Sequence, residues 1–190
     1  TLSIIKSAIR ILGVAASALV AFYVYKNRKL LIEVKHKATH DSLTNDFNRT
    51  KFVDDFNKGI HINNLIAFTD INKFKNINDT YGHETGDVAL VCISQILQET
   101  SRESDVLYRW GGEEFLIVIP ETNVVDLKEI AEKLRKNIDE MSCTTVPKIT
   151  CSFGAAVLDK KSDAIESFVD RADRAMYKAK ENGKNRTEYL

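Results

Sequence analysis

The chain has 190 residues, with 27 Lys and Arg against 27 Asp and Glu, and 44% of its residues are hydrophobic. This length and composition suit one globular core with an appendage, and they exclude a disordered or fibrous chain. The three cysteines lie far apart without a Cys-x-x-Cys pair, so we expect neither structural zinc nor a disulfide framework, and a reducing cytosol fits best.

The net charge of zero divides into a basic leader and an acidic body. Residues 1–38 carry a net charge of +6, and the remaining 152 residues carry −6. An acidic body is a poor general binder of nucleic acid, so neither DNA nor RNA is an expected partner, whereas a basic and apolar leader suits a membrane.

The leader contains a run of low polarity that is long enough to cross a bilayer. Within residues 2–25 only Lys6 and Arg10 are charged, and this helix would span about 30 Å of hydrocarbon if both side chains snorkel to the boundary. Tyr23 and Tyr25 lie at the end of this run and a basic cluster follows it, as at a cytoplasmic interface. We therefore predict a transmembrane helix over residues 1–25, in the inner or cell membrane, with the rest of the chain in the cytoplasm. The alternative is a buried or coiled-coil helix of a soluble protein.

Residues 26–40 are predicted to form a helical linker. Leu30, Leu31, Val34 and Ala38 recur at helical spacings among charged residues. Such a helix can pair with its twin and transmit a change of register, or it can be a plain solvated connector. The sequence leaves both interpretations open.

Residues 41–190 are predicted to form one domain in which helices and strands alternate. Helices are expected over residues 48–58, 84–100, 124–138 and 163–182, and strands over residues 65–71, 105–110, 115–119, 148–158 and 185–190. Helices packed on one mixed sheet make an α/β (α+β) sandwich.

Two glycines and two glutamates connect the strands at 105–110 and 115–119. Gly111 and Gly112 allow a positive φ and a close approach to the backbone, and Glu113 and Glu114 place carboxylates at the tip of the hairpin. If the strand that ends in Asp70 lies alongside, Asp70 faces Glu113 across one end of the sheet, and two hard oxygen donors at that spacing suit Mg²⁺ held with substrate phosphates. Taken alone, the turn fits a solvated polar loop equally well.

Several blocks of sequence, in one order, resemble the GGDEF-domain diguanylate cyclases, here as a GGEEF variant. The blocks are Asp-Ser-Leu-Thr at 41–44 with Asn-Arg at 48–49, the run from Asp70 to His83 with Gly-Asp at 86–87, Arg-Trp-Gly-Gly-Glu-Glu-Phe at 109–115, and Ala-Asp at 172–173 with Tyr-Lys-Ala-Lys at 177–180. The resemblance implies a polymerase-palm-like domain whose central sheet has about five strands flanked by helices.

The resemblance also implies a reaction. Each domain would bind one GTP, and two domains would meet in a homodimer so that each 3′-hydroxyl attacks the other α-phosphate. The products would be cyclic di-GMP and pyrophosphate. The alternative is a catalytically silent receptor of the same fold that binds cyclic di-GMP or GTP.

The family's metal and catalytic positions can be carried over to this chain. The resemblance implies that Asp70, the backbone carbonyl of Ile71 and Glu113 hold Mg²⁺, with Mn²⁺ as the other candidate. It implies that Glu113, with Glu114 beside it, accepts the proton. Lys75 would stabilise charge on the phosphates.

The remaining substrate contacts follow from the same resemblance. A carboxylate and an amide can read the Watson–Crick edge of guanine and reject adenine, because adenine leaves buried polar groups unpaired. The implied guanine readers are Asn78 and Asp87, the implied pocket residues are His83 and Phe74, and the implied ligands of the β- and γ-phosphates are Lys180 and Lys184.

A second nucleotide site is implied by an Arg-x-x-Asp motif, Arg102 to Asp105, with five residues between it and Gly111. In the family this is the product-inhibition site, where arginine and aspartate bind guanine and phosphate of cyclic di-GMP.

The chain departs from the family pattern at three places. Asn72 stands where a second aspartate is usual, and Lys184 stands where arginine is commoner. At 45–47 Asn-Asp-Phe replaces the usual Gly, aliphatic residue and Pro, which predicts altered packing of this segment onto the domain.

Overall fold

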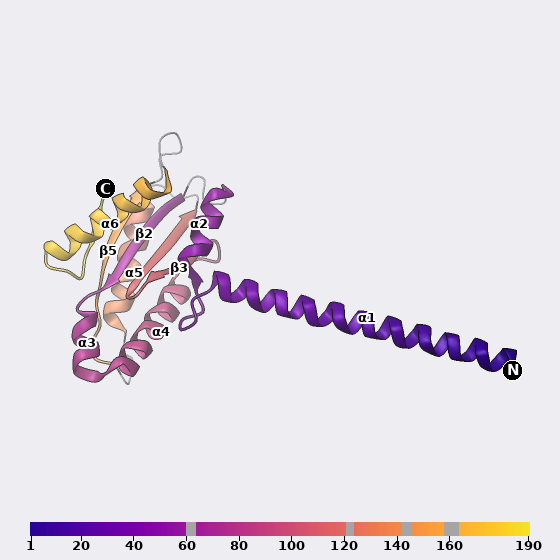
Figure 1. Ribbon diagram of the computed structural model, residues 1–190. Helices are drawn as coiled ribbons and strands as arrows, with labels where there is room; N and C mark the ends of the chain where they lie inside the picture. Colours follow the sequence, from indigo (N-terminus) through magenta and orange to yellow (C-terminus); the bar gives the residue numbers. More distant parts are fainter. Residues whose placement is uncertain (60–63, 121–123, 142–145, 158–163) are drawn as a thin grey trace. The chain divides into compact units, whose positions relative to one another are not determined.

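The computed structural model describes residues 1–59, 64–120, 124–141, 146–157 and 164–190 (Figure 1). The chain divides into two compact units, residues 1–38 and residues 39–190. Helix α1 (Leu2–Thr39) is continuous through the predicted span and linker. Among the described residues it is the one helix long and apolar enough to cross a membrane, with a mean hydropathy of 1.8 over 18 residues, none of which is buried.

The second unit is built on a six-stranded sheet, which confirms the predicted α/β sandwich. The strands are β1 (Phe47–Asn48), β2 (Asn64–Ile71), β3 (Val106–Gly111), β4 (Glu114–Pro120), β5 (Cys151–Val157) and β6 (Thr187–Tyr189), in the order β1-β3-β4-β2-β5-β6. The central strand β2 is antiparallel to both β4 and β5, and the short strands β1 and β6 add in parallel at the edges. The pattern did not predict β1, because two residues cannot show an alternation.

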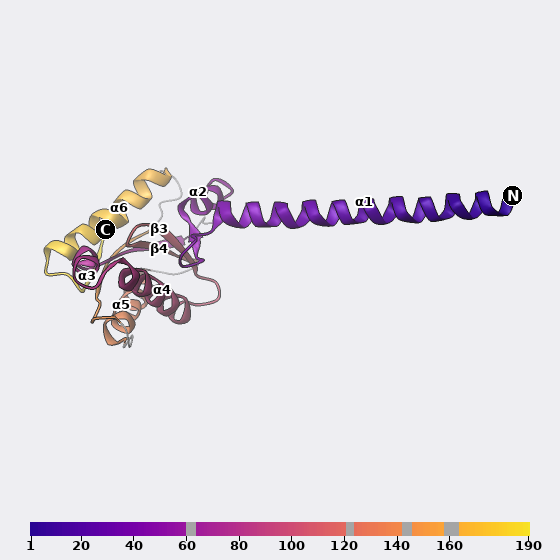
Figure 2. The ribbon, with the colours of Figure 1, turned by 60° about the horizontal axis from the view of Figure 1, so that its bottom comes forward.

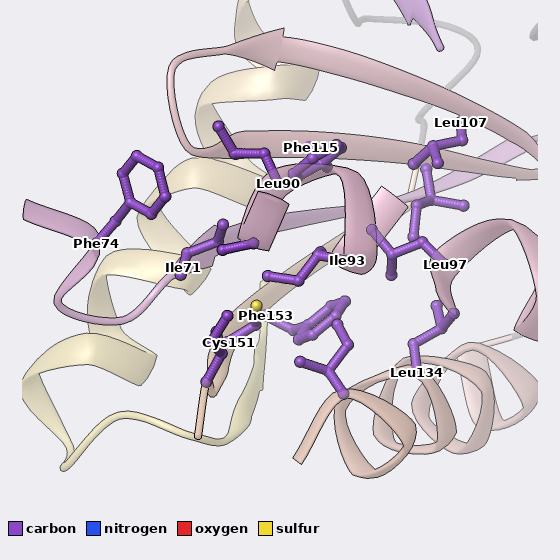
Figure 3. Close-up of a cluster of buried hydrophobic side chains, with 14 of the residues drawn as sticks. Ile71, Phe74, Leu90, Ile93, Leu97, Leu107, Phe115, Leu134, Cys151 and Phe153 are labelled. Atoms are coloured by element: carbon purple, nitrogen blue, oxygen red, sulfur yellow. The ribbon is translucent and has the colours of Figure 1, made fainter. Parts of the chain in front are cut away.

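Helices cover both faces of the sheet (Figure 2). The helices are α2 (Arg49–Asn57), α3 (Phe74–Tyr81), α4 (His83–Thr100), α5 (Val124–Glu140) and α6 (Ile165–Glu181). Apolar side chains of α3, α4 and α5 pack with β5 residues on one face (Figure 3), whereas those of α2 and α6 pack with Tyr108 and Leu116 on the other. Helix α3 was not predicted, since its eight largely polar residues are too few to show a helical period.

Helix α6 lies directly on β5 at a glycine. A Cβ atom at Gly154 would lie 2.1 Å from the backbone oxygen of Ala172 and 2.1 Å from the backbone nitrogen of Met176. Any larger residue would push the helix away from the sheet, so Gly154 sets the height of α6 above β5. The last turn of this helix carries Lys180.

The cysteines differ in part from the expectation. Cys92, on α4, is disulfide-bonded, a single bond that the expectation of no disulfide framework did not include. Cys151 is a free thiol buried in β5. Cysteine spacing alone does not report such a bond, because residues far apart in sequence can meet in the fold.

Candidate active site

Three of the predicted acids meet at one end of the sheet. Asp70 is the partner of Glu114 in the register of β2 and β4, and Glu113 precedes Glu114 in the turn. The backbone N–H of Ile71 donates to the carbonyl oxygen of Glu113 at 3.3 Å, which ties the turn to the end of β2. Asp70 is 5% exposed, so its carboxylate is largely withdrawn from water.

Lys180 reaches this group of acids from α6. Its Nζ lies 2.8 Å from Oδ2 of Asp70, with 30% of the lysine side chain exposed and 7% of the aspartate side chain. The ammonium was expected on the phosphates of a bound nucleotide. In the structure it is paired with a carboxylate that was expected to hold metal.

The acids raise one another's pKa values. Burial raises the pKa of Asp70, Glu113 and Glu114, and the charge of Asp70 raises the values of both glutamates further, while Lys180 acts in the opposite direction on all three. Asp173 of α6 adds repulsion to Asp70 and Glu114. We call Asp70, Glu113, Glu114 and Asp173 the acid cluster. Asp173 belonged to a matched block but was given no role, because only the fold brings α6 over β2.

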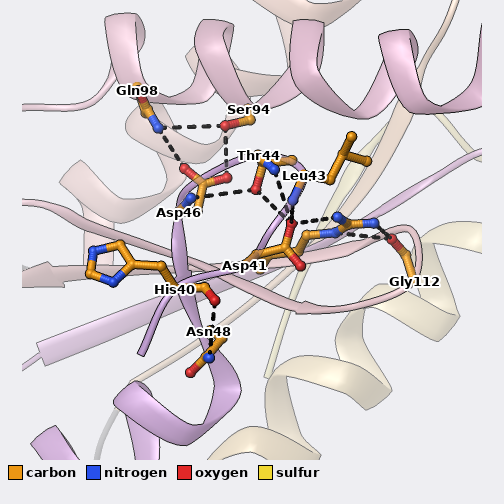
Figure 4. A network of polar contacts seen from close by, with 10 residues as sticks. His40, Asp41, Leu43, Thr44, Asp46, Asn48, Ser94, Gln98 and Gly112 are labelled. Atoms are coloured by element: carbon orange, nitrogen blue, oxygen red, sulfur yellow. Dashed lines mark hydrogen bonds and ion pairs between the residues drawn. The ribbon is translucent and has the colours of Figure 1, made fainter. Parts of the chain in front are cut away.

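The turn between β3 and β4 is held from the segment that follows α1. We call residues 40–48 the connector. Nη1 of Arg109 lies 2.6 Å from Oδ1 of Asp41, and Nη2 of the same guanidinium donates to the carbonyl oxygen of Gly112 at 2.8 Å (Figure 4). Gly112 has a φ of +46°, in the left-handed region that its missing side chain permits. The arginine thus fixes the backbone immediately before Glu113.

Asp46 explains one departure from the family pattern. It is 4% exposed, and its carboxylate accepts hydrogen bonds from Oγ of Ser94 at 2.7 Å and from Nε2 of Gln98 at 2.5 Å, both on α4 (Figure 4). The packing at this position is polar. Where the family usually has an aliphatic side chain, the carboxylate of Asp46 joins the connector to α4 by hydrogen bonds.

Asn72 explains another departure. Its Nδ2 donates to Oγ1 of Thr150 at 3.0 Å, and its Oδ1 accepts from Oγ of Ser152 at 2.7 Å. The side chain is bonded to the β5 side of the molecule. These contacts use both ends of an amide, and a carboxylate at this position could not donate to Thr150.

The predicted guanine readers lie at the corner between α3 and α4. Oδ1 of Asn78 is buried and has no hydrogen-bond partner. A Cβ atom at Gly86 would lie 1.9 Å from this oxygen, so the glycine makes room for the amide. The side chains of Asp87 and His83 are exposed on the first turns of α4. The amide of Asn78 therefore already holds a buried and unpaired acceptor at this corner, whereas the side chains of Asp87 and His83 face solvent.

Phe74 lies in the apolar core. It is 8% exposed and belongs to the cluster that contains Ile77 and Leu90 (Figure 3). Its ring also approaches Gly86, with Cζ 3.2 Å from where a Cβ would stand. The ring therefore packs behind the corner between α3 and α4 and does not face solvent.

The two other lysines predicted to act on the phosphates, Lys75 and Lys184, are exposed to solvent. Lys75 is on the first turn of α3, and Lys184 follows α6 with a φ of +63°. Lys184 lines a cavity of about 500 Å³ together with Lys73 and Asn76 of the α3 region. This cavity joins the turn after α6 to the helix that follows Asp70.

The Arg-x-x-Asp motif forms a compact turn before β3. The backbone N–H of Arg102 donates to Oδ2 of Asp105 at 2.8 Å, and the arginine side chain is exposed. Oδ1 of Asp105 is buried without a hydrogen-bond partner. Both residues line a cavity of about 240 Å³ with Lys133 of α5. An unpaired acceptor beside two cationic side chains is suited to a nucleotide with N–H donors and phosphates.

The donor set at the end of β2 fits a hard divalent cation. The part of the chain that the structure describes contains no group of three or more His, Cys, Asp or Glu side chains arranged to hold a metal ion. A site here therefore needs backbone or ligand oxygens besides carboxylates, which is usual for Mg²⁺ bound with nucleotide phosphates. The ammonium of Lys180 already lies on Asp70, so the cluster attracts a cation within the protein itself.

Comparisons with known proteins agree on one family. The family described as "Diguanylate cyclase, GGDEF domain" matches residues 38–186. Diguanylate cyclase DgcM of Escherichia coli (strain K12) is 33% identical over 167 residues, which are 85% of this chain and 40% of that protein. Diguanylate cyclase VdcA of Vibrio cholerae is 36% identical over 168 residues, 84% of this chain and 49% of that protein. The chain thus spans less than half the length of these relatives.

Solved structures give the same result. The coiled coil and GGDEF domain of DgcB from Caulobacter crescentus, in complex with c-di-GMP, has a TM-score of 0.85 at 28% identity and covers 93% of this chain and 98% of that one. The active GGEEF domain of a diguanylate cyclase from Vibrio cholerae has a TM-score of 0.63 at 32% identity, with 74% and 90% covered.

Proposed function

The chain belongs to the diguanylate cyclase GGDEF-domain family, and from this premise we propose that it condenses two molecules of GTP into cyclic di-GMP and two pyrophosphates. The observation that carries the proposal is the meeting of Asp70, Glu113 and Glu114 at the end of β2, with Lys180 2.8 Å from Asp70. Phosphoryl chemistry needs such a place, where cations and proton acceptors surround a polyanion.

The residues of this chain have distinct tasks in the proposed reaction. Asp70, the carbonyl of Ile71 and Glu113 would hold Mg²⁺, which when bound neutralises the triphosphate and lowers the pKa of the attacking 3′-hydroxyl. Glu113, with Glu114 beside it, is the proposed proton acceptor. Burial raises the pKa of both carboxyl groups, which strengthens them as bases.

Cationic side chains would position the phosphates. Lys75 is exposed on the first turn of α3, Lys184 lines the cavity beside α3, and Lys180 contacts Asp70. Lysine ammonium groups act on phosphates as point charges, so they can follow the triphosphate as charge moves to the leaving pyrophosphate.

Guanine recognition is assigned to the corner between α3 and α4. The unpaired Oδ1 of Asn78 can accept from an N–H of the guanine Watson–Crick edge, and Asp87 can accept from a second. Adenine offers no N1–H donor, so it would leave a buried acceptor unsatisfied. This supports GTP over ATP as substrate.

The proposed enzyme works as a homodimer, because each half of the product comes from one bound GTP. One domain presents one nucleotide, and its partner presents the other with the opposing 3′-hydroxyl. Cyclic di-GMP is also the proposed inhibitor, bound at Arg102 and Asp105. A silent receptor of the same fold is not favoured, since the family's acidic turn and Asn78 are intact and the relatives above are named as cyclases.

We propose that α1 anchors the protein in the membrane and that the domain lies in the cytoplasm. Its apolar window has a mean hydropathy of 1.8 over 18 residues, and basic residues follow it as a flank. Extraction of membranes with high salt should leave the full chain in the pellet, and detergent should release it. Release by salt alone would exclude a spanning helix.

Product analysis tests the proposed activity. The full chain in detergent micelles, given Mg²⁺ and GTP, should form cyclic di-GMP and pyrophosphate in a ratio of about 1:2, as detected by mass spectrometry and a coupled pyrophosphate assay. ATP in place of GTP is the matched control and should give little product. Nucleotide that remains unconverted, with cyclic di-GMP still bound, would favour the receptor instead.

A further inference from the structure

Lys180 and a bound divalent cation would both use the carboxylate of Asp70. The ammonium is 2.8 Å from Oδ2 of Asp70, and this pair is mostly shielded from water, with 30% and 7% of the two side chains exposed. A metal ion that binds Asp70 therefore meets an existing cation on the same carboxylate, and the repulsion between the two positive charges favours departure of the ammonium. Breaking a shielded ion pair costs more than displacing water from a solvated carboxylate.

The surroundings explain why the ammonium stays on Asp70. Four carboxylates, those of the acid cluster, act electrostatically on one another at this end of the sheet, and Lys180 is the cation that counteracts three of them. Without an attached cation, these charges would repel each other in a partly buried site. Lys180 therefore balances the cluster while no ligand is bound.

We propose that Lys180 is a resident counter-ion of the acid cluster, which keeps free divalent metal out and is drawn from Asp70 to the phosphates when metal and nucleotide arrive together. The proposal deepens the proposed function, because it gives one side chain two successive partners. Metal brings two positive charges and the triphosphate supplies the negative charge that Lys180 then requires. The cluster would thus bind the metal–nucleotide complex in preference to the metal alone.

Metal binding without nucleotide tests the first half of the proposal. Mn²⁺ affinity is measured on the full chain by electron paramagnetic resonance. Lys180→Met should bind Mn²⁺ about tenfold more tightly than the natural chain, or better, which corresponds to at least about 1.4 kcal/mol. Lys180→Arg keeps the charge and should bind as weakly as the natural chain. Lys178→Met, on an exposed position of the same helix, is the matched control and should change nothing.

Coupling to nucleotide tests the second half. GTP that lacks the 3′-hydroxyl cannot be turned over, so its effect on Mn²⁺ affinity can be measured at equilibrium. In the natural chain this nucleotide should tighten Mn²⁺ binding by a larger factor than in Lys180→Met, because only the natural chain has a counter-ion to remove. Equal factors in the two proteins would overturn the transfer of Lys180.

A measurement on the natural chain covers the case in which Lys180→Met fails to fold. With ¹³C at lysine Cε, the resonance of Lys180 should hold its position when Mg²⁺ alone is added and shift when Mg²⁺ and the 3′-deoxy nucleotide are added together. A shift with low concentrations of Mg²⁺ alone would overturn the proposal. These binding results do not depend on turnover. Absence of cyclic di-GMP in the product assay would therefore contradict the proposed function, whereas the role of Lys180 is decided by the metal-binding measurements alone.

Discussion

The connector and the acid cluster both contain carboxylates withdrawn from water, and their surroundings shift the pKa values in opposite directions. Burial alone would raise the pKa of Asp41, but the backbone N–H of Thr44 and the guanidinium of Arg109 outweigh it and lower the value. In the acid cluster, burial and mutual repulsion raise the pKa of Asp70 and both glutamates despite Lys180. The connector thus stabilises the fold, whereas the cluster keeps unfavourable charge that a bound cation can relieve.

The largest effect is expected at the cluster. Glu113→Gln removes a proposed metal ligand and proton acceptor, so the rate of cyclic di-GMP formation should fall by about 10³-fold or more. The fold should survive, because the lost carboxylate is one of several that repel each other. Thermal unfolding provides the control for folding. An unchanged rate would show that Glu113 has a structural role, like the carboxylates of the connector, and takes no part in the reaction.

The opposite behaviour is expected in the connector. Asp41→Ala removes the ion pair with Arg109 and two hydrogen bonds from the backbone N–H groups of Leu43 and Thr44. The free energy of unfolding should fall by about 1–3 kcal/mol at pH 7, as measured by urea denaturation.

The pH dependence of this loss has a definite sign. The folded pKa of Asp41 lies below its ordinary value, so its contribution is present at neutral pH and is lost as the pH falls below about 4. The natural chain and Asp41→Ala should therefore converge in stability on acidification. A difference that persists at low pH would mean that the charge of Asp41 is not the cause.

The turn from Arg102 to Asp105 contains a further carboxylate without a full set of partners, and we expect it to bind a ligand. Oδ1 of Asp105 is buried without a hydrogen-bond partner, next to the exposed Arg102. Arg102→Ala should raise the inhibition constant for added cyclic di-GMP by about tenfold, since a charge-assisted contact to phosphate or guanine is worth about 1.5–3 kcal/mol. Each protein's rate without added product serves as its own reference. Equal inhibition of both proteins would show that Arg102 does not bind the inhibitor.

The smallest effect is a gain in stability. The pKa of Glu114 is raised in the folded state, so its ionisation disfavours the fold, and stability decreases as the pH rises through the folded value. Glu114→Gln should therefore raise the unfolding temperature of the metal-free chain by about 1–3 °C at pH 7.5. The gain should vanish near pH 4, where the natural carboxyl group is protonated. A loss of stability at pH 7.5 would show that the carboxylate is well paired.

Elements with long or strongly patterned sequences could be predicted, whereas the pairing of particular strands was only a hypothesis. The sequence predicts that Asp70 faces Glu113 if its strand lies beside the double-glycine turn. The strands are neighbours, but the register of β2 and β4 places Asp70 opposite Glu114. Helix α3 escaped prediction because its eight residues are mostly polar. Helical periodicity needs more residues than that to become visible.

Contacts that depend on the packing of α6 could not be read from the sequence. The ion pair between Lys180 and Asp70 and the repulsion from Asp173 arise only when α6 lies on the sheet at Gly154. The same holds for Asp46, whose partners Ser94 and Gln98 are about 50 residues away on α4. A sequence pattern indicated that the 45–47 segment is unusual, but the fold supplies the donors that make a buried carboxylate acceptable.

The central claim is that Asp70 and Glu113 hold one cation beneath the triphosphate of GTP. The most direct test is Mn²⁺ affinity, measured by electron paramagnetic resonance with saturating 3′-deoxy GTP, for the natural chain, Asp70→Asn and Glu113→Gln. Both substitutions should weaken Mn²⁺ binding by a similar factor, about 10–100-fold, because each removes a charged ligand of the same ion. Affinity equal to that of the natural chain in either variant would contradict a shared site.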